Sequence, residues 1–65
     1  MKPNDIKAAL VKAGISQRAL ARKAGVSDSL ISAVIKGQRT QGDIAKRCQW
    51  IIALEINKPV QKVFP

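Results

Sequence analysis

Apolar residues recur at helical spacing along the chain, in short segments that are bounded by capping residues and glycines. The first segment predicts a helix over residues 5–13, with Asn4 as its N-cap. Gly14 follows and is suited to end this helix in a left-handed conformation. The apolar stripe of the segment consists of Ile6, Ala9, Leu10 and Ala13, at positions i, i+3, i+4 and i+7.

Two further segments follow the same pattern. Ser16 is a candidate N-cap for a helix over residues 17–24, and Ser27 is a candidate N-cap for a helix over residues 28–36. Gly25 stands in the turn between them, where a glycine tolerates a positive φ angle. The residues that we expect to face inward from these two helices are Leu20, Ala21, Ala24, Ile31, Val34 and Ile35.

The C-terminal part of the chain predicts one longer helix and a final turn. Thr40 and Asp43 have the spacing of a capping box, and the helix that follows should end near Leu54. Pro59 suits the first position of a short fifth helix, which would carry Val60, Val63 and Phe64 at helical spacing. The predicted inward stripe of the longer helix consists of Ile44, Cys48, Ile51 and Ile52.

These segments predict an all-α fold, a compact bundle of four to five short helices in one domain over residues 1–65. No apolar run approaches the roughly 18 residues of a membrane-spanning helix, and no signal peptide is evident, so we expect a soluble cytoplasmic protein. The predicted core comprises Ile6, Leu10, Leu20, Ala21, Val26, Ile31, Val34, Ile44, Cys48 and Ile51.

The composition points to an anionic partner. Lys and Arg number 12 against 4 Asp and Glu, which gives a formal charge of +8, and a compact basic domain favours nucleic acid over a membrane surface. The chain has no His and a single cysteine, Cys48, which we expect to be a buried structural thiol. We therefore expect no metal site, no cofactor, no small-molecule ligand and no enzymatic activity.

Residues 17–36 have the pattern of a helix-turn-helix. Ala21 is small where the two helices must approach, and Val26 fills the corner after Gly25. This stretch resembles the helix-turn-helix of the phage Cro and C1 repressor superfamily, the XRE-like, lambda repressor-like domains. More loosely, residues 5–10 followed by Gly14, and the ending from residues 52–54 to residues 63–65, look like the Ner-type regulators of transposable phages, whereas residues 38–42 and 54–59 depart from that pattern. The positions that match the superfamily pattern are Gln17, Ala21, Gly25, Val26, Ile31 and Val34.

The resemblance implies a phage or bacterial transcription regulator whose second motif helix, residues 28–36, enters the major groove of an operator in double-stranded DNA. Asp28 could instead only stabilise its own helix dipole, and as a base contact it can only accept hydrogen bonds. The residues expected to reach base edges are Asp28, Ser29, Ser32, Ala33 and Lys36. The residues expected to contact phosphates are Gln17, Arg18, Ser27, Gln38, Arg39 and Thr40.

Trp50 and Leu54 widen the apolar arc of the longer helix beyond one core face. Either the tail over residues 60–64 covers them, which is the preferred expectation, or a second copy of the chain does, in a homodimer on DNA. Two other functions compete with DNA binding. An antitoxin-like or adaptor module could hold a protein partner on the same fold, whereas membrane-surface binding would need a longer amphipathic helix.

Overall fold

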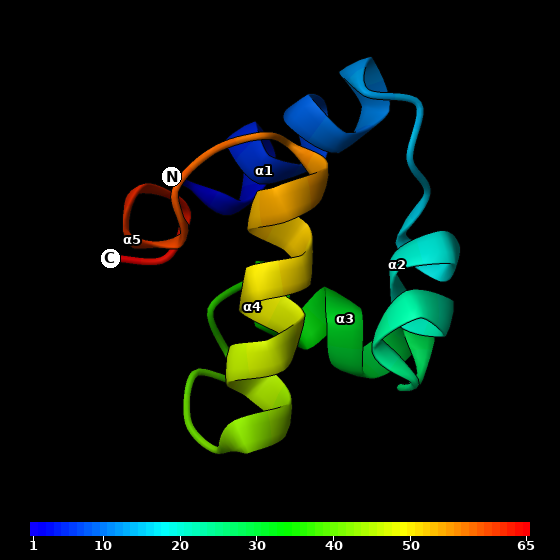
Figure 1. Cartoon of the computed structure of the whole chain (residues 1–65), viewed down its shortest axis with the longest axis vertical. Helices are drawn as coiled ribbons and strands as arrows, with labels where there is room; N and C mark the ends of the chain where they lie inside the picture. Colours follow the sequence, from blue (N-terminus) through cyan, green and yellow to red (C-terminus); the bar gives the residue numbers. More distant parts are fainter.

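The computed structural model describes residues 1–65 and contains five α-helices and no strand, which confirms the all-α expectation. The longest helix, α4, contacts α2, α3 and α5, and α1 contacts α3. In Figure 1, α4 stands at the centre of the molecule between α2 on one side and α5 on the other. No helix has the length and apolar character needed to cross a membrane. The helices are α1 (Pro3–Lys12), α2 (Gln17–Ala24), α3 (Asp28–Ile35), α4 (Asp43–Glu55) and α5 (Val60–Val63).

One apolar cluster of 13 buried residues joins all five helices. Most of the predicted core lies in it, although Val26 and Ile51 are only partly buried and pack against its edge. Burying such a continuous apolar surface is the main favourable term in folding, and the chain has no disulfide to supplement it. The predicted core residues that are fully buried are Ile6, Leu10, Leu20, Ala21, Ile31, Val34 and Cys48.

The buried face of α4 differs from the predicted one. Ile44 was expected inside but is 50% exposed, whereas Ala45 and Ala53 are buried together with Cys48 and Ile52. The apolar arc of this helix is wider than the face that its neighbours cover, so periodicity alone did not identify which edge faces inward. The prediction for Ile44 was therefore wrong.

Side-chain caps form at the two helices of the motif. The Ser16 Oγ accepts a hydrogen bond of 3.1 Å from the Ala19 amide, and the Ser27 Oγ accepts one of 3.2 Å from the Leu30 amide. Each cap satisfies one of the amide groups that the first turn of a helix leaves without a partner. Both predicted caps are confirmed.

The predicted starts of the other helices were wrong. Asn4 lies inside α1, because Pro3 already fits the first turn and the helix begins there. Thr40 makes no capping contact, since Gly42, at φ 96°, is the residue that precedes α4. Pro59 is likewise the residue before α5 and not its first residue.

The segment with α5 closes the bundle next to the start of α1. The Met1 ammonium donates hydrogen bonds of 2.9 and 3.0 Å to the carbonyl oxygens of Lys62 and Val63. Val63 is 1% exposed and belongs to the core, so α5 packs on α4 through this residue. The two ends of the chain lie near each other in Figure 1, on the side of α4 away from α2.

Candidate nucleic-acid interface

The turn between α2 and α3 fixes the angle of the motif. Gly25 has φ 70° and ψ 35°, in the left-handed region that ends many helices. The amides of Gly25 and Val26 donate to the carbonyls of Arg22 and Ala21, at 3.2 and 2.9 Å. Ala21 is 2% exposed, so the two helices meet over a small side chain. The buried residues of α3 then face the core, and its other face is left outward.

An open hollow of about 440 Å³ lies beside this outward face. It extends from the start of α2 along α3, and its lining is polar apart from one alanine. Every residue that lines it was predicted from the sequence to contact DNA. The lining consists of Gln17, Asp28, Ser29, Ser32, Ala33, Lys36 and Gln38.

The remaining phosphate candidates lie around the hollow or away from it. Arg18 is on the rim, because its Nε lies 3.6 Å from the Asp28 Oδ2. Ser27 precedes α3 and already uses its hydroxyl oxygen as a cap. Arg39 is exposed, and its amide donates to the Ala33 carbonyl at 3.3 Å, which holds it near the end of α3.

Thr40 lies on a different surface. It lines a second cavity of about 320 Å³, together with Lys36 and residues from both ends of the chain. The structure therefore does not bring Thr40 into the hollow, and a phosphate contact there would have to form at the margin of the interface. The phosphate contact at Thr40 stays a prediction.

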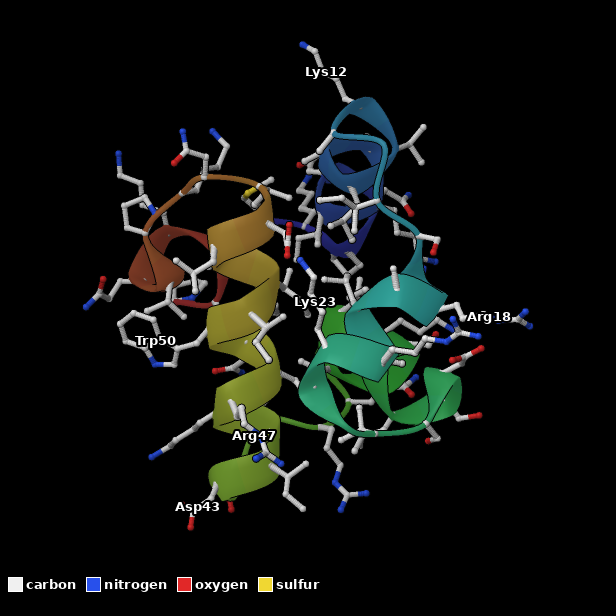
Figure 2. All side chains as sticks on the ribbon, turned by 45° about the vertical axis from the view of Figure 1, so that its right-hand side comes forward. Lys12, Arg18, Lys23, Asp43, Arg47 and Trp50 are labelled. Carbon is white, nitrogen blue, oxygen red and sulfur yellow. The ribbon has the colours of Figure 1, made fainter.

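The charge distribution of the hollow is mixed. Lys36 is its basic residue and Asp28 its acidic one, and Asp28 is offset by Arg18. Lys23, also on α2, pairs instead with Glu55 of α4 and is directed toward the bundle. Figure 2 shows this difference, with Arg18 extending outward and Lys23 lying between α2 and α4.

The Arg18–Asp28 pair was not predicted. The two residues were assigned separately, one to phosphate and one to a base, although both lie in the first turns of adjacent helices. The opposite charges of Arg18 and Asp28 were the one feature of the sequence that indicated an ion pair. Only the crossing of α2 and α3 shows that the side chains meet.

The apolar shoulder of α4, formed by Trp50 and Leu54, is uncovered. Trp50 is 57% exposed and Leu54 is 71% exposed, so the expectation that the tail covers them was wrong. The tail packs elsewhere on α4, through Val63. Figure 2 shows Trp50 and Arg18 pointing out on opposite sides of the molecule.

The fold and the arrangement of α2 and α3 define a helix-turn-helix domain. Comparison with known families agrees: residues 6–48 match the helix-turn-helix family, and the chain belongs to this XRE-like family of DNA-binding transcription regulators. Comparisons with curated proteins and with solved structures gave no match.

Proposed function

We propose that this chain is a sequence-specific regulator that binds operators in double-stranded DNA, a phage or prophage repressor of the Cro or Ner type. In this proposal α3 enters the major groove and α2 lies across the phosphate backbone. The observation that carries the proposal is the hollow beside α3, where seven polar or small residues from α2, α3 and the following loop share one surface.

The residues of this surface divide by their chemistry. Lys36 can donate to guanine, the hydroxyls of Ser29 and Ser32 suit either kind of base edge, and Ala33 can contact a thymine methyl group. Asp28, at the start of α3, completes the base-reading face. Phosphate contacts come from Gln17, Arg18, Ser27, Gln38, Arg39 and Thr40, and the formal charge of +8 supports this electrostatic share of the affinity.

Two copies of the chain bind together in this proposal. One helix of eight residues with short side chains contacts few bases, so a single domain would select weakly among genomic sites. The exposed Trp50 and Leu54 provide an apolar contact for a second copy, which would occupy a half-site about one helical turn away. The same face is what an antitoxin-like or adaptor module would offer to a different protein, and that is the alternative function.

Selection of bound duplexes from a random library, followed by binding titrations over a range of salt concentrations, tests the proposal. We expect one enriched sequence family and a log–log salt slope of about −0.9 for each phosphate neutralised. Lys36→Ala should weaken binding to the selected duplex much more than Lys12→Ala. Lys12 is a matched control because it removes the same charge from an exposed position at the far end of α1.

Two results would contradict the proposal. One is the absence of any enriched duplex, and the other is an equal loss of affinity in the Lys36 and Lys12 variants, which would indicate attraction by net charge alone. Binding to a protein partner without nucleic acid, in the first case, would favour the adaptor alternative.

A further inference from the structure

The ion pair between Arg18 and Asp28 joins the N-terminal turns of the two motif helices. Arg18 is the second residue of α2 and Asp28 is the first residue of α3. The Arg18 Nε lies 3.6 Å from the Asp28 Oδ2, and Asp28 lines the hollow. This is the only ion pair that links α2 to α3.

The pair contributes little to the stability of the fold. The side chains are 74% and 58% exposed, and ion pairs in such positions are weakened by water and salt. Its consequence lies in the orientation of the guanidinium group. The Asp28 carboxylate lies on the Nε side of the Arg18 guanidinium group, and the two Nη groups make no hydrogen bond to the protein. Figure 2 shows the Arg18 side chain extended away from the body of the protein.

An arginine whose Nε side faces Asp28 and whose two Nη groups are unpaired has the donor groups that guanine requires. The two Nη groups form a planar fork, and guanine presents two acceptors, O6 and N7, on its major-groove edge. The first turn of a recognition helix is the part that usually reaches base edges, and the contact with Asp28 places Arg18 beside that turn.

The pair also explains why the Asp28 carboxylate is tolerated on a surface that we propose to bind DNA. An unpaired Asp28 would face the phosphate backbone with a like charge, which is unfavourable. The Arg18 charge compensates it. When DNA excludes water from the rim of the hollow, a compensated carboxylate is better tolerated there than an isolated one.

We propose that Arg18 reads a guanine in the major groove of the operator and that Asp28 is the positioning residue that orients its guanidinium group. This inference rests on the proposed function and replaces the simpler roles of Arg18 as a phosphate contact and Asp28 as a base contact. Arg18 thereby becomes a specificity-determining residue contributed by α2, outside the recognition helix.

The test uses the selected duplex, a duplex of unrelated sequence, and copies of the selected duplex in which one guanine at a time carries 7-deazaguanine, which lacks the N7 acceptor. Binding of the parent protein should weaken at one such substitution. Arg18→Ala and Arg18→Lys should both reduce the preference for that guanine by about ten-fold, because lysine keeps the charge but lacks the fork. In both variants the 7-deaza substitution at that position should have no further effect.

Asp28→Asn separates positioning from direct contact. We expect it to reduce the preference for the same guanine several-fold while it strengthens binding to the unrelated duplex, since it removes a negative charge from the interface. Asp28→Glu, which keeps the carboxylate, should retain part of the guanine preference. The double variant Arg18→Ala/Asp28→Asn should select no worse than Arg18→Ala, because Asp28 acts through Arg18. Thermal unfolding of each variant checks that the fold is intact.

Three outcomes would overturn the inference while leaving the proposed function in place. Arg18→Lys could keep the guanine preference, as a phosphate contact would; Asp28→Asn could change the preference at a different base pair, as a direct reader would; or neither variant could change any preference. A parent protein that enriches no duplex would overturn the proposed function, and this inference with it.

Discussion

The Lys23 ammonium of α2 donates a hydrogen bond to the Glu55 Oε1 at the end of α4. The two residues are 32 positions apart, and this is the only ion pair that joins the motif to the longest helix. Lys23 is 60% exposed, whereas Glu55 is 21% exposed. The contact draws one basic side chain of α2 toward α4, while Arg18, on the same helix, remains at the candidate interface.

The Lys23–Glu55 pair should give a small coupling energy that depends on salt. In a double-mutant cycle of Lys23→Ala and Glu55→Ala, followed by urea unfolding, we expect about 0.2–1 kcal/mol at low salt, because Lys23 is largely solvated. Arg22→Ala, at an exposed neighbour without an ion-pair partner, is the control and should show no coupling to Glu55. A coupling energy that persists in 1 M salt would contradict the expected screening.

Replacing Ala21 by leucine should destabilise the protein. Ala21 is 2% exposed where α2 meets α3, and extra methylene groups at a packed crossing typically cost about 1–3 kcal/mol. Ala19→Leu is the matched control, since Ala19 lies on the exposed face of the same helix. If both variants unfold at the same urea concentration as the parent, the crossing is not packed as the structure describes it.

The sequence was informative where the determinants of structure are local. Ser16, Ser27 and Gly25 act within one helical turn, and all three were identified from the sequence. Local determinants were not always identified correctly, since the caps predicted at Asn4 and Thr40 were wrong. The failure in the core was non-local. The exposure of Ile44 depends on which side of α4 its neighbours cover, and an apolar arc wider than the covered face does not encode this.

The same distinction holds for the candidate site. The residues around the hollow were predicted because the positions of a helix-turn-helix fix which residues of α3 face outward. The pairing of Arg18 with Asp28 depends on the angle at which two helices cross, and it became visible only in three dimensions. The uncovered shoulder at Trp50 likewise depends on where α5 packs.

Cys48 should link stability to alkaline pH. Burial raises the pKa of its thiol above the ordinary value, and the nearby charge of Arg47 opposes this only in part. The folded protein holds the thiol proton more tightly than the unfolded chain does. The stability that the protonated thiol contributes to the folded state is therefore fully present below the pKa of the unfolded chain, at about 8.5, and is lost as the pH rises through the pKa of the folded protein. Urea unfolding between pH 7 and pH 10 should show this decrease.

Cys48→Ala is the variant that isolates the effect. It should lower stability at all pH values by creating a cavity, but the part of the alkaline decrease that comes from the thiol should disappear. The native thiol should also react with thiol reagents much more slowly than the thiol of the urea-unfolded chain. Equal reaction rates in the two states would show that Cys48 is accessible in the folded protein.

Trp50→Ala should affect pairing on DNA more than folding. Trp50 is 57% exposed and the tail does not cover it, so its loss should cost less than about 1 kcal/mol in free energy of unfolding. If it contacts a second copy, a large aromatic side chain at that contact contributes more than about 1 kcal/mol, and cooperative binding to a two-half-site operator should fall by at least several-fold. Binding of the Trp50→Ala variant to a single half-site should be unchanged, because the shoulder and Arg18 lie on opposite sides of the molecule.

Val11→Ala is the control, since Val11 is also an uncovered apolar residue, 79% exposed, on α1. Equal cooperativity in the Trp50 and parent proteins, measured by gel shift on both operators, would place the contact between copies elsewhere.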